Sequence, residues 1–188
     1  EALHEGSVDL IVWPEYTITS ALEFKDAYQG RFTSFARKYD TNLAIGSYKL
    51  VAPNASYSSR YNALHFFGDG FEDPYYLAQE AVTLFDPQVA LAKEGSPVMF
   101  DENHSLGFLL CYEENFPAVA AHHSGTLEAS SLISAGNQYY IGSPHGLWLS
   151  SLNSQARAAE NGRYLFRVLT SGYSMVISPQ GEVVASIE

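Results

Sequence analysis

Short apolar runs rich in β-branched and aromatic residues recur along the chain, and they predict a series of buried strands. Val8–Val12, Leu43–Tyr48 and Tyr61–Phe67 are the first three. Runs of roughly four to eight such residues, bounded by turn-forming residues, are typical of strands covered on both faces. Further strands are expected over Val98–Phe100, Leu106–Leu110, Ala129–Ser134, Leu165–Leu169, Tyr173–Ser178 and Val183–Ser186.

Three stretches between the strands are predicted to be helices. Asp26–Tyr39 carries apolar residues on one face and charges elsewhere, and Asn115–His123 is expected to form a short helix. Leu147–Asn161 is a longer helix followed by Gly162, a typical C-terminal cap. This mixture of strands and helices favours a layered α/β domain.

The composition fits a single globular domain and excludes several classes of partner. The chain has 188 residues, of which 46% are hydrophobic, and this is enough for a real core. Its 21 acidic and 10 basic residues give a net charge of −11, which argues against binding nucleic acid or docking electrostatically on anionic lipid. No apolar run is long enough to span a membrane. Because the first residue is Glu1, we expect the chain to be part of a longer protein.

Cys111 is the only cysteine, and it stands where a predicted buried strand ends. Leu106–Leu110 leads into it, and Asn115–Pro117 suits a turn into a helix. A nucleophile at such a turn is lifted clear of the sheet with backbone N–H groups beside it, which suits attack on a carbonyl carbon. Taken alone, however, a single cysteine is more often a buried, inert side chain.

Glu15 follows the first predicted strand just as Cys111 follows a later one. Ligands of such sheets bind beyond the carboxyl ends of the strands, so the two side chains are predicted to share one site on one sheet. A thiol needs a base, and a carboxylate in an apolar pocket can serve as one. The alternative is that Glu15 caps the next turn.

Three blocks of sequence, taken together, carry a family likeness. They are Asp9–Glu15, Gly107–Glu113 and Gln155–Arg163, the last continuing to Ile177–Glu182. In this order they resemble the carbon–nitrogen hydrolase (nitrilase) superfamily. The long C-terminal block looks most like the bacterial apolipoprotein N-acyltransferase branch. The likeness covers nearly the whole chain.

The resemblance implies a four-layer αββα sandwich of the nitrilase type and a Glu–Lys–Cys triad. Glu15 would be the general base and Cys111 the nucleophile that forms a thioester. The backbone N–H of Tyr112 would help to hold the oxyanion, and Glu113 would support the site. We expect no cofactor and no metal. The family's first strand and C-terminal end are expected to lie outside this chain, which would make the domain incomplete.

The lysine of the triad has no counterpart at its usual place. The family places it between the Tyr61-Asn62 strand and the cysteine, but Phe71–Ala92 contains neither Lys nor Arg. We therefore expect this stretch to be a loop or short helix near the pocket mouth that supplies no cationic donor. Three explanations stay open: Lys49 at a neighbouring strand end substitutes, Lys93 folds into the site, or the protein is a weak or inactive relative.

Other polar and aromatic residues give weaker signals. His122 and His123 are adjacent and point different ways on a helix, so they do not predict a metal site. Three arginines are expected to be structural partners of acids such as Glu160, namely Arg157, Arg163 and Arg167. Four aromatic side chains after the Ala129–Ser134 strand either border the pocket or form an exposed cover for a partner or lipid, namely Tyr139, Tyr140, His145 and Trp148.

Three functions remain open at this point. The first is an N-acyltransferase with a phospholipid donor and an amine acceptor, working on the periplasmic side of a bacterial cell membrane. The second is a cytoplasmic amidase that acts on a small amide with water as acceptor. The third is a catalytically degenerate relative with a binding role. The oligomeric state stays open.

Overall fold

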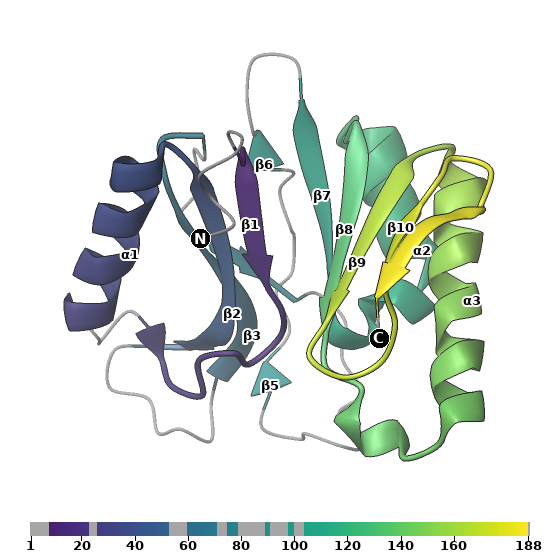
Figure 1. Cartoon of the computed structure of the whole chain (residues 1–188), viewed down its shortest axis with the longest axis horizontal. Coiled ribbons are helices and arrows are strands. Elements are labelled where there is room, and N and C mark those ends of the chain that lie inside the picture. Colours follow the sequence, from purple (N-terminus) through teal and green to yellow (C-terminus); the bar gives the residue numbers. More distant parts are fainter. Residues whose placement is uncertain are drawn as a thin grey trace.

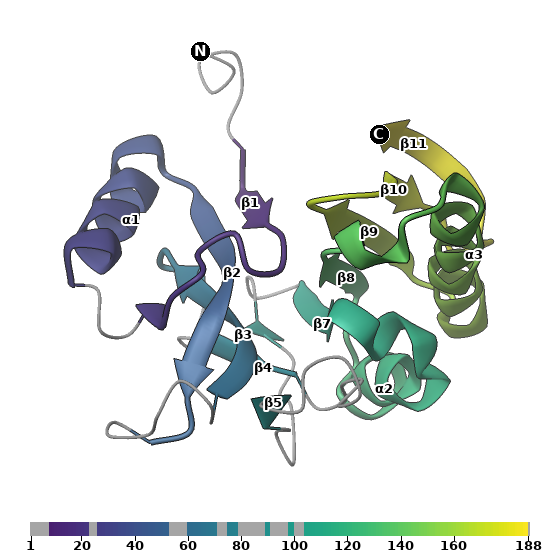
Figure 2. The same cartoon turned by 90° about the horizontal axis from the view of Figure 1, so that it is seen from below.

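The computed structural model describes residues 8–22, 26–52, 60–70, 75–78, 89–90, 98–99 and 104–187. Two β-sheets face each other at its centre (Figure 1 and Figure 2). Helix α1 (Asp26–Tyr39) covers the outside of one sheet, and helices α2 (Pro117–Ala121) and α3 (Pro144–Asn161) cover the outside of the other. The layers therefore follow the order α, β, β, α that the resemblance implied.

The first sheet is built around β2 (Asn42–Leu50) and β3 (Arg60–Phe67), which pair antiparallel. β1 (Leu10–Trp13) lies parallel to β2 at one edge, with α1 in the crossover. On the far side β4 (Tyr75–Leu77) and the short β5 (Val89–Ala90) both pair with β3. The last residue of β1 lies beside Ile45, so the chain that leaves β1 runs on past the second half of β2.

The second sheet has the strand order β11-β10-β9-β8-β7-β6. Its central strands β7 (Ser105–Leu110), β8 (Ser131–Gly136) and β9 (Tyr164–Leu169) are parallel, with α2 and α3 in the crossovers. β6 (Val98–Met99), β10 (Ser174–Ile177) and β11 (Val183–Ile187) are antiparallel additions. Because β7 and β8 are parallel, their carboxyl ends meet at the same edge of the sheet.

Alternation along the strands decides which side chains fill the space between the sheets. Leu64 of β3 and Tyr76 of β4 point inward and belong to one buried cluster with Phe108 of β7. Ile45 of β2 points the other way and packs under Ala36 of α1. An inward position therefore faces the second sheet, and an outward position on the first sheet faces the helical layer.

The long C-terminal helix begins earlier than its apolar spacing predicts. α3 starts at Pro144 rather than Leu147, because the Ser143 hydroxyl caps it by accepting the N–H of Gly146 at 3.0 Å. Proline at the first helical position suits such a start, since its missing N–H would have no partner there. Gly162 ends the helix in the left-handed conformation with φ 59°, as predicted.

The predicted helix Asn115–His123 is shorter in the structure. α2 covers Pro117–Ala121, because Pro117 takes the first helical position. A 3-10 turn over Cys111–Asn115 precedes it, and a π-helical turn over His122–Thr126 follows it.

The expectation for Phe71–Ala92 is wrong for the residues that the structure describes there. Tyr75–Leu77 and Val89–Ala90 are strands rather than a loop or helix. The free edge of β3 recruits β4, and the N–H of Ala78 extends the pairing by donating to the Asn62 carbonyl at 3.0 Å. The rest of this stretch lies outside the described residues. No helix in the described part of the chain is long and apolar enough to cross a membrane.

Candidate active site

Cys111 occupies a sharp turn at the carboxyl end of β7. Its φ of 61° lies in the left-handed region, which a non-glycine residue adopts only when its surroundings hold it there. The turn packs against the neighbouring strand: a Cβ on Gly136, at the end of β8, would lie in ordinary contact, 3.6 Å from Cα of Cys111. The local sequence thus builds the strand-to-turn elbow that the pattern predicted.

Glu15 lies in a tight turn directly after β1 and is only 4% exposed. The turn is held by Thr17, whose hydroxyl donates to the Pro14 carbonyl at 2.8 Å. Two donors bind the Glu15 carboxylate: the side-chain amide of Asn62 at 2.6 Å and the backbone N–H of Asn137 at 2.9 Å. Asn62 comes from β3 and Asn137 follows β8, so both sheets hold this carboxylate.

The Glu15 carboxylate lies beside the Cys111 thiol, close enough for its negative charge to raise the pKa of that thiol. The predicted proximity is therefore confirmed, but the predicted reason was wrong, because the two residues follow strands of different sheets. Burial, followed by the negative charge of Glu15, raises the pKa of the Cys111 thiol, and the N–H of Tyr112, which binds the sulfur, opposes this shift. The resting pair is thus a neutral thiol beside a carboxylate that can take its proton.

Glu113 is fully buried and supports the elbow from behind. Its Oε2 accepts the N–H of Leu110 at 2.7 Å and the hydroxyl of Tyr76 at 3.0 Å. The side chain of Tyr112, by contrast, is partly exposed and packs on the ring of Phe116. Glu113 therefore ties the last residue of β7 to β4 of the facing sheet.

Tyr76 and His123 form a second contact behind the elbow that sequence reasoning missed. The Tyr76 hydroxyl lies 3.3 Å from Nε2 of His123. Burial, followed by the charge of neighbouring His122, lowers the pKa of His123 to about 4, so the ring is neutral at physiological pH. Tyr76 lies in the stretch that was expected to be a loop or short helix, and no local pattern marks it as a partner of Glu113.

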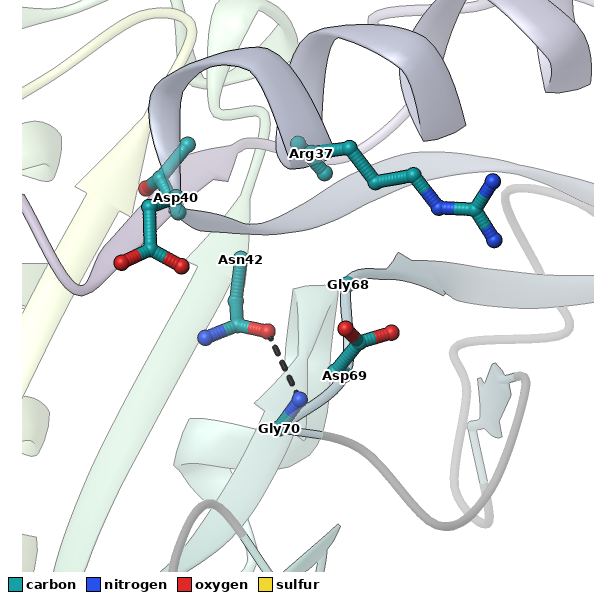
Figure 3. Close-up of a pocket in the computed structure, with 8 residues that line it drawn as sticks. Arg37, Asp40, Asn42, Gly68, Asp69 and Gly70 are labelled. Carbon is teal, nitrogen blue, oxygen red and sulfur yellow. Dashed lines mark hydrogen bonds between the residues drawn. The ribbon is translucent and has the colours of Figure 1, made fainter.

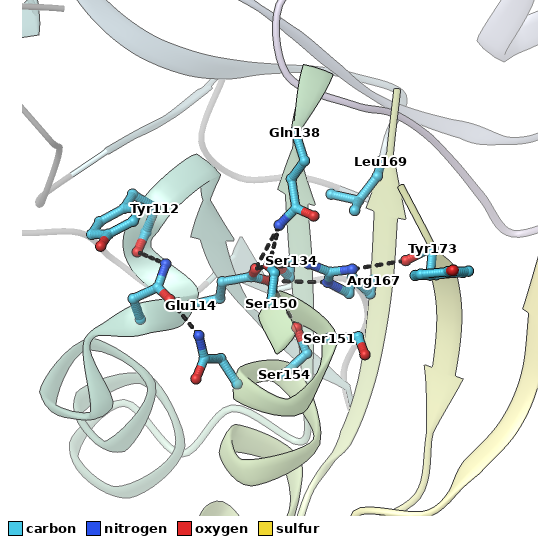
Figure 4. A network of polar contacts seen from close by, with 12 residues as sticks. Tyr112, Glu114, Ser134, Gln138, Ser150, Ser151, Ser154, Arg167, Leu169 and Tyr173 are labelled. Atoms are coloured by element: carbon cyan, nitrogen blue, oxygen red, sulfur yellow. Dashed lines mark hydrogen bonds and ion pairs between the residues drawn. The ribbon is translucent and has the colours of Figure 1, made fainter. Parts of the chain in front are cut away.

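Glu114 lies at the centre of a buried polar network (Figure 4). The Arg167 guanidinium binds both of its oxygens, at 2.9 and 3.1 Å. Four other side chains donate to the same carboxylate, namely Ser134, Gln138, Ser150 and Ser154. Burial alone would raise the pKa of Glu114, but the hydrogen bonds and charge of Arg167 lower it below its usual value. The network joins the elbow to β8, β9 and α3.

Lys49 lies on the face of β2 that points away from the second sheet. Its ammonium is 4.8 Å from the centroid of the Tyr75 ring. The next residue along β4, Tyr76, is the one that points inward to Glu113. By strand alternation Lys49 and Tyr75 share the outer face, so the structure does not bring Lys49 to Cys111.

The other described lysine does not reach the sulfur either. Lys38 lies in α1, with its ammonium over the ring of Tyr39. Lys93, the second candidate for the triad lysine, lies outside the described residues. Among the described residues, the donor found at the sulfur is therefore the backbone N–H of Tyr112.

The remaining candidates fall into two groups. Arg157 pairs with Glu160 at 2.6 Å, and Arg167 pairs with Glu114, so both have the structural role expected of them. Tyr140 is 53% exposed, and it borders the site, because partial burial and then the nearby charges of Cys111 and Glu15 raise the pKa of its phenol. Three others are also exposed, namely Tyr139, His145 and Trp148. No cluster of acidic, histidine or cysteine side chains suited to a metal occurs in the described ranges.

A separate polar cavity of about 190 Å³ lies at the end of α1 (Figure 3). Asp40 and Asp69 line it, and Oδ1 of Asn42 accepts the N–H of Gly70 there at 2.9 Å. Asn42 is the first residue of β2, whereas the Glu15 turn passes its second half. This cavity is therefore not part of the thiol site.

The whole chain is similar in sequence to known proteins of one family. The sequence profile of the carbon-nitrogen hydrolase family matches residues 1–188. The apolipoprotein N-acyltransferase of Neisseria meningitidis serogroup B is 23% identical over 212 residues, which cover 100% of this chain and 41% of that protein. The enzyme of the same name from Pseudomonas aeruginosa strain LESB58 is 24% identical, with 99% and 39% covered. The chain thus spans about two fifths of these relatives.

Solved structures share the fold. A carbon-nitrogen hydrolase from Helicobacter pylori G27 has a TM-score of 0.80 at 17% identity, covering 96% of this chain and 74% of that one. The NitFhit protein of C. elegans has a TM-score of 0.77 at 21% identity, covering 96% of this chain and 50% of that one.

Proposed function

The chain belongs to the carbon–nitrogen hydrolase family, and we propose that it transfers acyl groups through a thioester on Cys111. The buried Glu15 carboxylate beside the Cys111 thiol is the observation that carries this proposal: Asn137 donates its N–H to Glu15, and the preceding residue, Gly136, lies against Cys111. This arrangement joins a nucleophile to a base at the end of a strand, with the N–H of Tyr112 beside the sulfur. Nucleophilic catalysis at a carbonyl carbon needs these groups in contact.

In the first half-reaction Glu15 takes the thiol proton while Sγ of Cys111 attacks the carbonyl carbon of the donor. A C–S bond forms and the electron pair of the carbonyl moves to its oxygen, where the N–H of Tyr112 is available as a donor. The oxyanion then collapses and the bond to the leaving oxygen breaks. Glu15 returns its proton to the leaving alcohol, and the thioester remains.

In the second half-reaction an amine nitrogen attacks the thioester carbon. Glu15 takes a proton from the amine, the C–S bond breaks, and the thiolate of Cys111 recovers its proton as the amide leaves. The relatives are named apolipoprotein N-acyltransferases. From that likeness we take the donor to be a phospholipid ester and the acceptor to be the N-terminal amine of a lipoprotein, on the periplasmic side of a bacterial membrane.

A weakly active or inactive site is the second candidate. The observation that favours it is the lack of a lysine at the sulfur among the described residues. Loss of one oxyanion donor typically costs about 10²–10³ in rate. Amide hydrolysis would use the same thiol and carboxylate and would differ only in taking water as the acceptor.

The test is mass spectrometry of the protein after brief mixing with a p-nitrophenyl acyl ester. We expect an acyl adduct on Cys111 that is absent from Cys111→Ala. Added glycine ethyl ester should then remove the adduct faster than buffer does and yield the acyl amide, whereas a hydrolase would release the free acid. If no adduct forms while iodoacetamide still labels Cys111, the site is inactive and the proposal fails.

A further inference from the structure

Gln138 links the Glu114 network to the turn that holds Glu15. Its side-chain amide donates to Oε1 of Glu114 at 3.1 Å, and Figure 4 shows it reaching toward this network. The N–H of the preceding residue, Asn137, donates to Oε2 of Glu15 at 2.9 Å. Gln138 is only 6% exposed. Two consecutive residues therefore contact the network on one side and the base on the other.

These contacts close a ring through the active site. The Cys111 thiol lies beside Glu15, Glu15 accepts from Asn137, and Gln138 donates to Glu114. Glu114 then leads back to Cys111, because both lie in the same 3-10 turn. The elbow that carries the nucleophile and the turn that holds the base are thus joined by the hydrogen bond of Gln138.

The acceptor end of this hydrogen bond is rigidly held. Glu114 and Arg167 are each 1% exposed, and the carboxylate is bound by donors from three elements besides the Gln138 turn. The position of the Asn137 N–H is further set by the turn itself, where Ile141 donates its N–H to the Gln138 carbonyl at 3.0 Å. An anchored carboxylate can therefore hold Gln138 in place.

We propose that Gln138 is a positioning residue: by binding Glu114 it holds the N–H of Asn137 against the Glu15 carboxylate. This inference rests on the proposed function only in taking Glu15 as the base of Cys111. A hydrogen bond donated to an ionised carboxylate stabilises the ionised form. Weakening the bond from the Asn137 N–H therefore makes Glu15 bind its proton more tightly. The titratable groups facing Glu15 are Cys111 from the elbow and Tyr140 from the turn, and Asn62 faces it from β3.

The test is the pH dependence of Cys111 alkylation by iodoacetamide, which requires no acyl substrate. Once Glu15 is protonated it cannot take the thiol proton, so the alkylation rate falls along an acidic limb. Gln138→Met keeps the side-chain size but removes the donor, and it should move this limb about one unit to higher pH, the effect of one charge-assisted hydrogen bond. Ser154→Ala is the matched control: it removes a donor to the same carboxylate but leaves the turn intact, so its limb should stay at the wild-type position.

The outcomes separate positioning from structural damage. An unchanged limb in Gln138→Met, or equal shifts in both variants, would overturn the inference. If Gln138→Met does not fold by circular dichroism, Gln138→Asn, whose shorter side chain falls short of Glu114, carries the same expectation. An equal shift when Gln138→Met is made in a Glu15→Gln background would also overturn it, because Glu15 could not then be the source of the shift. The acidic limb could also shift in Gln138→Met but not in Ser154→Ala while the protein forms no acyl adduct. That result would support this inference and refute the proposed function.

Discussion

The Glu15 carboxylate and the Cys111 thiol meet across the two sheets of the sandwich. Glu15 follows β1 of the first sheet, and Cys111 follows β7 of the second. The thiol and the carboxylate therefore come together only when the sheets are packed face to face. The buried residues between the sheets, such as Leu64 and Phe108, hold the nucleophile and its base together.

Glu15→Gln should lower turnover by about 10²–10⁴, the usual contribution of a general base. The fold should survive, because the amide has nearly the same shape. The pKa of the Cys111 thiol, which burial and then the charge of Glu15 raise, should fall when this charge is removed. Alkylation at alkaline pH measures this: the basic limb should move to lower pH, and an unmoved limb would contradict a charged carboxylate at the sulfur.

Gly46→Ala should destabilise the protein by about 1–3 kcal/mol, as overpacking does. A Cβ at this position would lie 2.0 Å from the Pro14 carbonyl oxygen and 2.8 Å from Cα of Glu15. Thermal melting should show a loss of several degrees. Gly30→Ala is the matched control: no atom lies within 4 Å of its Cβ in α1, so it should stabilise by about 0.5–1 kcal/mol. Equal melting temperatures for the two variants would show that the backbone of Pro14 and Glu15 does not lie so close to Gly46.

His123 should make the protein acid-sensitive. Burial, then His122, lowers its pKa from 6.5 to about 4 in the folded state. As the pH falls, the unfolded chain therefore binds a proton at His123 before the folded protein does. The contribution of the neutral ring to the free energy of unfolding is complete above pH 6.5 and is lost as the pH falls toward 4. The loss is up to about 3 kcal/mol.

Urea unfolding at neutral pH and near the lower end of this window measures the effect. His123→Gln, which can still hydrogen-bond to Tyr76, should reduce the loss of stability on acidification. His145→Gln changes an exposed histidine and should leave the loss unchanged. An equal loss in wild type and His123→Gln would assign the acid sensitivity to other groups.

Lys49→Met should leave turnover within about twofold, because its ammonium lies over Tyr75 on the outer face of the first sheet. A cation–π contact that is only partly buried contributes about 0.5–1 kcal/mol, so stability should change little. The assay is the acyl-transfer rate measured beside Glu15→Gln. A loss of about tenfold or more in kcat, as expected for an oxyanion donor, would return Lys49 to the mechanism.

Arg167→Met should destabilise the fold by about 3–5 kcal/mol, because it leaves the Glu114 carboxylate buried without its cation. The double variant Arg167→Met with Glu114→Gln removes both charges and should recover part of this loss. Urea unfolding of the wild type, of each single variant and of the double variant gives the coupling energy. Simple additivity would show that the pair does not act as a unit.

The sequence by itself determined the local settings of the two central residues. An apolar run followed by a turn marks a strand end, so the positions of Glu15 and Cys111 after β1 and β7 could be predicted from neighbouring residues alone. Gly162 could be predicted in the same way, since a helix cap depends on adjacent backbone. The order of strands and helices predicted a layered α/β domain, whereas the four-layer αββα sandwich followed from the family resemblance of the ordered blocks.

Only the tertiary structure decided which strand ends face one another and what holds them. Two strands with similar patterns can belong to one sheet or to two, and the choice depends on packing between distant segments. The outward direction of Lys49 depends on the register of β2 against its partners. Tyr76 and Gln138 carry no local signal, because a hydroxyl or an amide becomes a positioning group only when the fold brings a buried carboxylate within hydrogen-bond distance.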